Sequence, residues 1–381
     1  MIIGIISIGT FANYFFGVAN QTLLMADQAS YIYDTVSIVS TIANTLLTVL
    51  LMKLNQSIFI VKLGSSIVYF LSPLFLNFYV RKKYDLTSNC EADNSPLKNR
   101  SAVMFHSIAN IVHQNTDVVL LTLFTDAKII SVYSVYYLVV GKMRTLLNSL
   151  TSGFEAAMGN MWAKKEYDSL ETAFSGVEYI CYSFSFVIFS CVAILLVPFI
   201  KLYTSGVADV QYVRIDFAAL VIVAEMIFCI RQPYLCLVQA AGFYNETKKG
   251  AIFEAATNVI SSLILVLILG LNGVIIGTIL ANLIRTTQYA WYVKRKILKH
   301  GTTSIIKRLL WLVIAFLITV TVVTVIVSYV IIDGWIGWVI KGVIAFVLVA
   351  LIQYISSVLL FKKDFQYCIS RLKSILVKKR H

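Results

Sequence analysis

The sequence predicts an all-α, polytopic membrane protein with about 11 transmembrane helices. Of its 381 residues, 59% are apolar and 13% are charged, and the mean hydropathy is +0.82. An average soluble domain has about 25% charged residues, so a soluble core could not absorb this much apolar surface. The chain has only 4 prolines, and its long apolar runs favour helices over the alternating strands of a transmembrane barrel.

Apolar windows of about 20 residues, the length that crosses a hydrocarbon core, recur along the chain. The first window has no basic n-region and no clear cleavage site, so we interpret it as a true span and not as a signal peptide. The expected spans cover residues 2–24, 31–52, 57–80, 102–124, 129–150, 175–200, 214–240, 251–270, 273–293, 309–331 and 336–361.

The basic residues indicate the orientation of these spans. If the N-terminus lies outside, 22 of the 32 Lys and Arg residues fall on one side, and only Lys53, Lys128, Lys201 and Arg214 on the other. Cytoplasmic loops carry an excess of Lys and Arg. We therefore expect an outside N-terminus and a cytoplasmic C-terminus in a cell membrane, and we interpret the net charge of +13 as a topology signal and not as a nucleic-acid site.

An internal repeat suggests two lobes. Residues 42–83 resemble residues 256–296: Asn44 matches Asn258, Gly64 matches Gly277, and YVRKK matches YVKRK. The copies are six spans apart, which implies a parallel repeat of six-span lobes and a first lobe without its opening three spans. The predicted parts are a partial N-terminal lobe, a polar cytoplasmic linker, a six-helix C-terminal lobe, and two extra transmembrane helices with a basic tail, at residues 1–80, 81–101, 102–296 and 297–381.

The fourth span carries a polar stripe. His106, Asn110, His113 and Asp117 follow one another at separations of four, three and four residues, which places them on one helical face. Ionisable residues inside spans usually face a cavity. We interpret the stripe as the lining of a wet pathway, where Asp117 could bind a cation or a proton and the histidines could titrate. The alternative is a set of interhelical hydrogen bonds that join the lobes.

Basic residues in other spans form a second group of candidates that suit a phosphate or carboxylate ligand. These are Lys142, Arg144, Arg231 and Arg285. Lys142 and Arg144 are two residues apart and cannot share a helical face, so at most one of them points squarely at a central cavity.

Arg231 has two interpretations. It stands two residues before Pro233, where a kink and a freed carbonyl could accompany a binding site or a hinge. A structural salt bridge to Glu225 or Glu254 explains it equally well.

No motif points to catalysis, a cofactor or a metal. Walker A, HExxH and GxSxG sequences are absent, and the longest hydrophilic segments are too short for a nucleotide-binding or glycosyltransferase domain. The six cysteines lack a CxxC pair, and we interpret them as packing residues. We expect a transporter that is not an enzyme; short outer loops disfavour a membrane glycosyltransferase or polymerase. The cysteines are Cys90, Cys181, Cys191, Cys229, Cys236 and Cys368.

Four stretches carry a family resemblance. They are LLMADQASYIYDTVSIVSTIAN (23–44), NTDVVLLTLFTDAKIISVYSVYYLV (115–139), GFEAAMGNMWAK (153–164), and the most specific, RQPYLCLVQAAGFYNETKKGAIFEAATNVISSLILVLILGLNGVIIGT (231–278). With these residues the chain resembles the polysaccharide flippases, the O-antigen and capsule repeat-unit translocases of the multidrug/oligosaccharidyl-lipid/polysaccharide exporter superfamily.

The resemblance implies two six-helix lobes, two C-terminal helices and a central cavity that faces each side of the membrane in turn. It implies a lipid-linked oligosaccharide on a polyprenyl diphosphate as substrate, membrane lipids as surroundings, and polysaccharide polymerase machinery as a partner. The residues that match cavity-facing helices are His106, Asn110, His113, Asp117, Lys142, Arg144, Arg231 and Arg285. The alternatives are a cation-coupled drug or small-molecule exporter of the same architecture and a truncated flippase that does not transport.

Overall fold

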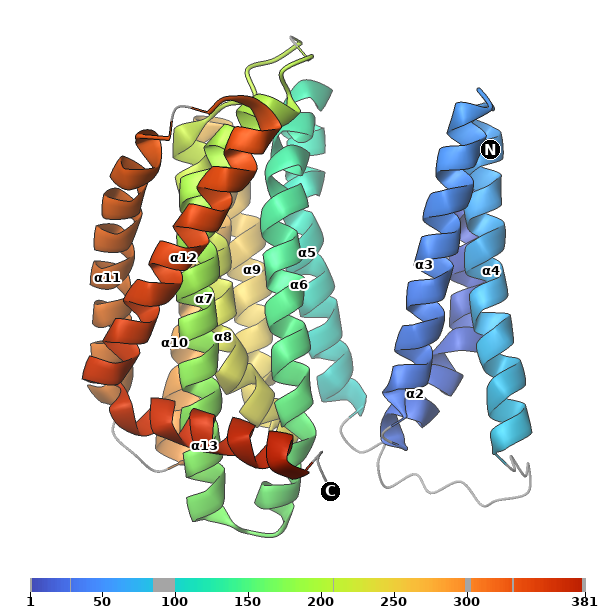
Figure 1. The fold of residues 1–381 in the computed structure, drawn as a ribbon. Helices are drawn as coiled ribbons and strands as arrows, with labels where there is room; N and C mark the ends of the chain where they lie inside the picture. The colour runs from blue at the N-terminus through green and yellow to red at the C-terminus, as the bar shows by residue number, and fades with distance from the viewer. Residues whose placement is uncertain are drawn as a thin grey trace. The chain divides into compact units, whose positions relative to one another are not determined.

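The computed structural model describes residues 2–27, 29–84, 100–207, 209–298, 303–330 and 332–378. The regular secondary structure of these residues is entirely helical, which confirms the all-α prediction. The chain divides into two compact units, which we call unit 1 (residues 1–93) and unit 2 (residues 94–381) (Figure 1). Most of the predicted linker at 81–101 lies outside the described residues, and so does Cys90.

Unit 1 is built around α4, which packs against both α1 and α3. The turn η1 is a single π-helical turn that interrupts the first expected span. A small core of Leu24, Ala29, Leu76 and Val80 joins the helices at one end. The apolar window of α3 is not buried within the unit, as expected for a surface that faces lipid. Its elements are α1 (Ile2–Ala12), η1 (Asn13–Gly17), α2 (Val18–Ala26), α3 (Ser30–Lys53) and α4 (Ile58–Lys83).

Unit 2 is a bundle in which α8 contacts α6, α7 and α10, while α5 packs against α9 (Figure 1). The helices α11 and α12 pack against α7. Its elements are α5 (Arg100–Phe124), α6 (Ala127–Ala163), α7 (Tyr167–Tyr203), α8 (Ile215–Ala240), α9 (Tyr244–Leu269), α10 (Leu271–Tyr292), η3 (Val293–Ile297), α11 (Thr303–Ser328), α12 (Gly334–Leu360) and α13 (Lys362–Lys378).

Among the described residues, 7 helices are long and apolar enough to cross a membrane. These are Tyr31–Lys53, Ile58–Lys83, Tyr167–Tyr203, Ile215–Ala240, Tyr244–Leu269, Lys307–Ser328 and Gly334–Leu360. They confirm a multi-pass membrane protein. The other four expected spans coincide with helical segments, namely α1 to α2, α5, α6 and α10, of which the last three carry all the polar candidates except Arg231 of α8.

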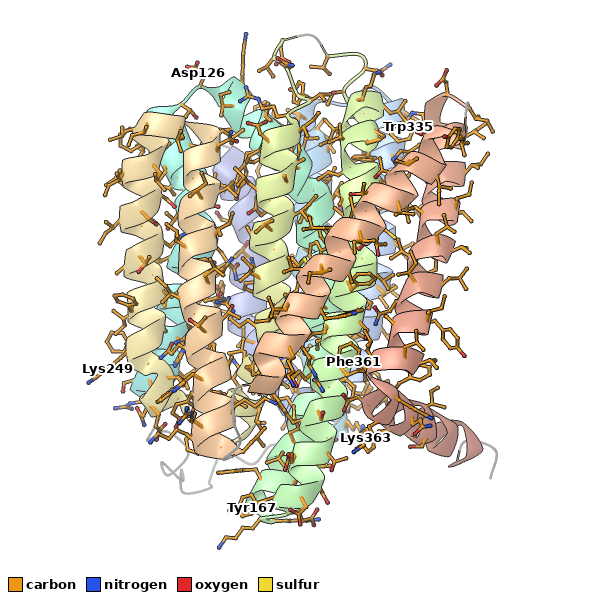
Figure 2. The ribbon with its side chains drawn as sticks, turned by 90° about the vertical axis from the view of Figure 1, so that its left-hand side faces the viewer. Asp126, Tyr167, Lys249, Trp335, Phe361 and Lys363 are labelled. Carbon is orange, nitrogen blue, oxygen red and sulfur yellow. The ribbon has the colours of Figure 1, made fainter. Side chains whose placement is uncertain are left out.

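Two basic residues far apart in the sequence lie at the same end of unit 2. Figure 2 shows Asp126 and Trp335 at one end, and Tyr167, Lys249 and Lys363 at the other. The basic residues Lys249 and Lys363 therefore share an end of the bundle, as the alternation of the spans requires. That this end faces the cytoplasm stays a prediction.

The two matched stretches of the internal repeat are both helical hairpins, α3–α4 and α9–α10. Gly270, with a φ of +57°, makes the turn of the second hairpin, a conformation that favours glycine. In each hairpin the matched glycine allows close packing: a Cβ on Gly64 would lie 3.2 Å from Leu47, and one on Gly277 would collide with Ser262. How the two copies are oriented relative to one another stays a prediction.

The segment after α12 forms a helix, α13, where the sequence indicated only a basic tail. Its sequence is amphipathic, and the helix lies across one end of the bundle (Figure 1). Asp364 fixes its start, because the carboxylate accepts hydrogen bonds from Arg308 at 2.6 Å and Ser175 at 2.8 Å. The Cys368 thiol contacts the carbonyl of Gly176, and burial raises the pKa of that thiol to about 11.

A buried carboxylate connects four helical elements near the same end of unit 2. Glu178 on α7 is 1% exposed and pairs with Arg308 of α11 and, at 3.4 Å, with Lys294 of η3. It also accepts a hydrogen bond from Tyr234 of α8. Arg308 therefore joins Glu178 to Asp364, and through it holds α13 against the bundle.

Candidate functional site

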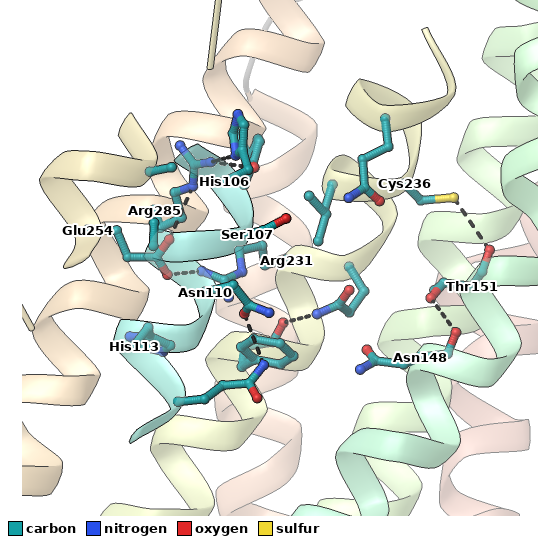
Figure 3. A pocket seen from close by; sticks show the side chains of 18 of the residues that line it. His106, Ser107, Asn110, His113, Asn148, Thr151, Arg231, Cys236, Glu254 and Arg285 are labelled. Carbon is teal, nitrogen blue, oxygen red and sulfur yellow. Dashed lines mark hydrogen bonds and ion pairs between the residues drawn. The ribbon is translucent and has the colours of Figure 1, made fainter. Parts of the chain in front are cut away.

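A polar cavity of about 410 Å³ lies among α5, α6, α8, α9 and α10 of unit 2 (Figure 3). Three arginines and two glutamates line it, so its charged lining has an excess of one positive charge when histidine is neutral. The other polar side chains that line it belong to histidine, asparagine, glutamine, serine, threonine and tyrosine residues. Charged side chains are costly within the hydrocarbon region and are retained where they face a cavity or one another.

The cavity brings together six of the eight predicted site residues. The α5 stripe contributes three, and α6, α8 and α10 contribute one arginine each. These six residues are His106, Asn110, His113, Arg144, Arg231 and Arg285. Asp117 and Lys142 do not line it.

Glu254 of α9 is the centre of the charged wall. Its carboxylate accepts a hydrogen bond from Arg231 and lies 3.3 Å from Nε of Arg285 (Figure 3). The two arginine side chains are 5% and 2% exposed, so one buried carboxylate serves two buried guanidinium groups. Of the two interpretations of Arg231, the salt bridge to Glu254 is therefore the one that the structure contains. Nε of Arg231 is buried and has no hydrogen-bond partner within the described residues.

The guanidinium nitrogens of Arg285 are hydrogen-bonded to other residues of the chain. One nitrogen donates to the carbonyl of Thr247 at 3.0 Å and to Gln288 at 2.6 Å, and the other contacts Tyr289 and, at 3.3 Å, Nδ1 of His106. Nε2 of His106 lies 3.0 Å from a backbone carbonyl. A carbonyl only accepts and a guanidinium only donates, so these contacts require the His106 tautomer with its proton on Nε2. Arg285 thus holds α5, α9 and α10 together.

Arg144 is the most accessible of the three arginines, with 18% of its side chain exposed. Its guanidinium carbon lies 3.4 Å from the ring centre of Phe228, and that of Arg231 lies 4.5 Å from the same ring. The Phe228 ring therefore holds two cations near one another through cation–π contacts. Glu225, which is almost fully buried, lies 3.7 Å from Arg144 and forms an ion pair with it.

Asp117 is buried outside the cavity. Its two oxygens accept hydrogen bonds from Thr278 of α10 at 2.8 Å and from Tyr133 of α6 at 3.3 Å. These bonds join helices of unit 2 to one another; they do not join the two lobes, as the alternative interpretation had it. Lys142 is exposed on α6, two residues from Arg144, and a helix places residues two apart on different faces.

Several lining residues were not among the predicted ones. Arg144 is followed on α6 by Asn148, Thr151 and Glu155, and all four line the cavity. Their separations of four, three and four residues repeat the spacing of the α5 stripe. The pattern was therefore present in the sequence, but the expected span ended at residue 150, whereas α6 continues to Ala163.

The cavity offers cations, hydrogen-bond donors and an aromatic face. Within the described residues, no group of three or more His, Cys, Asp or Glu residues could hold a metal ion. Five cysteines are free thiols in the same part of the chain. This arrangement can bind a polar, anionic group by charge-assisted hydrogen bonds.

No family model matches the sequence, and no curated protein does so either. Among solved structures, the chain is similar to one described as "Lipid II flippase MurJ, inward closed conformation", with a TM-score of 0.58 and 15% sequence identity. The match covers 93% of this chain and 73% of the other. The two proteins share a fold, which supports the exporter-type architecture of the predicted fold class.

Proposed function

We propose that the chain translocates polyprenyl-diphosphate-linked oligosaccharide repeat units across the bacterial cytoplasmic membrane for cell-surface polysaccharide biosynthesis, by alternating access. The observation that carries the proposal is the convergence of Arg144 and Arg231 on one polar cavity within a membrane-spanning bundle. The similarity of the fold to a lipid II flippase supports it.

In this proposal the diphosphate of the substrate binds at Arg144 and Arg231. A diphosphate carries its charge on several oxygens, and guanidinium groups match such oxygens with paired N–H donors. Glu254 keeps Arg231 in place between substrates, and Phe228 spaces the two cations. The step lowers the cost of moving a polar head group through hydrocarbon while the lipid tail stays in the bilayer. It breaks no covalent bond and needs no cofactor.

The experiment measures flipping in proteoliposomes that contain a fluorescent polyprenyl-diphosphate oligosaccharide, with a membrane-impermeant quencher reporting which leaflet the label occupies. Arg144→Gln removes a cation from the cavity, and Lys142→Gln is its matched control, because it removes the same charge from the exposed face of the same helix. A lost charge-assisted hydrogen bond is worth about 1.5–3 kcal/mol, so we expect flipping to slow by at least about tenfold in the first variant only.

Equal flipping by the two variants, with both shown to be folded by their thermal unfolding, would refute the role of Arg144. No flipping by the unaltered chain, with tight binding of the lipid-linked substrate retained, would refute translocation.

The cation-coupled exporter is the second candidate. Its predicted ion-binding residue, Asp117, already accepts hydrogen bonds from Thr278 and Tyr133. Ion-dependent efflux of a small molecule that Asp117→Asn abolishes would favour the exporter, and accumulation of lipid-linked repeat units on the inner leaflet of cells that lack the chain would favour the flippase.

A further inference from the structure

Unit 1 contains a cavity of its own, to which the proposed function assigns no role. It has a volume of about 510 Å³ and is lined by residues of α1, η1, α3 and α4. Its polar lining consists mainly of hydroxyl and amide groups: five serines, a threonine, two asparagines and two tyrosines. Hydroxyl groups both donate and accept hydrogen bonds, so this lining complements a ligand that also does both.

The backbone around this cavity is irregular in two places. The turn η1 (Asn13–Gly17) is π-helical, and both of its end residues line the cavity. Pro73 of α4 also lines it, and proline cannot donate the hydrogen bond that the carbonyl of Tyr69 would otherwise accept. In a membrane protein, irregular backbone is tolerated where it is buried or lines a polar cavity, and π turns are frequent at functional sites.

One wall of the cavity has unused hydrogen-bonding capacity. Asn44 of α3 donates to the hydroxyl of Tyr69 at 3.4 Å, but its own side-chain oxygen is buried and has no partner within the described residues. A buried acceptor without a hydrogen-bond partner destabilises the folded state. Asn44 lines the cavity, so a ligand hydroxyl or amide N–H could satisfy this oxygen if the amide turned toward the cavity.

Lys62 is the one charged residue of the described lining. No carboxylate lines the cavity with it, and no ion pair of Lys62 is recorded in the described part of the chain. The cavity of unit 2 differs in kind, because there three arginines are offset by two glutamates. The cavity of unit 1 is thus adapted to a mostly neutral, hydroxyl-rich ligand with one acidic group.

We propose that the cavity lined by Ser40, Asn44, Lys62 and Tyr69 in unit 1 binds carbohydrate, with Lys62 selecting a sugar that carries one acidic substituent. Sugars present dense hydroxyl groups that match the serine-rich lining, and an apolar face that matches a tyrosine ring. The assignment of this sugar to the glycan of a lipid-linked substrate rests on the proposed function. The binding of carbohydrate to this cavity does not.

The test is saturation-transfer NMR on the full chain in phosphatidylcholine nanodiscs. The probes are tri-galacturonic acid, the neutral maltotriose, and glycerol 3-phosphate, which mimics a lipid head group. We expect both sugars to receive saturation. Lys62→Met should weaken binding of the acidic sugar by about tenfold and leave maltotriose unchanged, because only one charge-assisted contact is lost. Lys53→Met is the matched control, an exposed lysine of unit 1 outside the cavity, and should change neither.

A second pair of variants tests the hydroxyl-rich wall. Ser40→Leu fills the cavity and should abolish binding of both sugars. Tyr69→Phe removes one hydroxyl group without changing the volume, and should weaken both sugars by about two- to tenfold. If Ser40→Leu lowers the thermal unfolding temperature and cannot be used, Tyr69→Phe carries the test alone.

Absence of saturation on both sugars would overturn the proposal, and so would equal binding of the acidic sugar by the Lys62 and Lys53 variants. Binding of glycerol 3-phosphate in preference to either sugar, and dependent on Lys62, would show a lipid head-group site instead. An Arg144 variant that no longer flips the substrate but still binds sugar would count only against normal translocation and not against sugar binding in unit 1. The failure of the carbohydrate proposal can therefore be distinguished from the failure of the proposed function.

Discussion

Glutamine in place of Glu254 tests the charge balance of the unit 2 cavity. The Glu254 carboxylate pairs with Arg231 and, at 3.3 Å, with Arg285, whose side chains are 5% and 2% exposed. Glutamine keeps an oxygen that can accept a hydrogen bond, but the negative charge is lost. Two buried guanidinium groups then share a cavity wall with no anion between them.

The magnitude follows from the burial. Removing one partner of a buried ion pair costs about 3–5 kcal/mol, and because glutamine retains one acceptor we expect the lower value, about 3 kcal/mol. At about 2–4 °C per kcal/mol for a bundle of this size, the unfolding temperature should fall by about 6–12 °C. An anion that replaces the carboxylate should restore most of this, since a ligand at 100 times its Kd stabilises by about 2.7 kcal/mol.

The assay is thermal unfolding in nanodiscs, with and without pyrophosphate. Glu155→Gln is the matched control: Glu155 lines the same cavity, but no ion pair to it is recorded in the described residues. We expect Glu254→Gln to be clearly less stable than Glu155→Gln and to gain more from pyrophosphate. The reasoning is refuted if the two variants unfold at the same temperature, or if pyrophosphate stabilises both equally.

Three further predictions concern packing and polar contacts in unit 2. Asp117→Asn should lower stability by about 1–2 kcal/mol and leave pyrophosphate affinity unchanged, since Asp117 is outside the cavity; altered affinity in a titration would contradict this. Gly277→Ala should cost about 1–3 kcal/mol, because its Cβ would collide with α9, whereas Gly153→Ala meets open space and should be neutral or stabilising in thermal unfolding. Arg308→Gln breaks the contact with Asp364 and should speed hydrogen exchange in α13; unchanged protection there would count against the Glu178 network.

The periodicity of apolar and polar residues made part of the site predictable. His106, Asn110 and His113 could be placed on one face of α5 because the spacing along a helix fixes the face on which a residue lies. The second stripe, from Arg144 to Glu155, obeys the same rule but runs past the end of its apolar window. A hydropathy window ends where polar residues begin, although the helix itself can continue beyond that point.

The partners of individual residues could not be predicted in this way. Asp117 lies on the same stripe as His113, yet its oxygens accept from Thr278, which is 161 positions away along the chain, and from Tyr133. Such contacts depend on which helices pack side by side, and apolar periodicity carries no information about that choice. The same reason explains why Glu254, and not Glu225, pairs with Arg231.

The sequence by itself determined that this is an all-α, multi-pass membrane protein, because hydrocarbon admits only chains whose backbone hydrogen bonds are satisfied within the segment. It also determined which faces of the helices are polar. Only the tertiary structure decided which polar side chains meet in a cavity and which are hydrogen-bonded to neighbouring residues. Arg144 and Arg285 both line the cavity, but the guanidinium of Arg285 already donates hydrogen bonds to Thr247 and Gln288, because helix packing sets which groups lie within its reach.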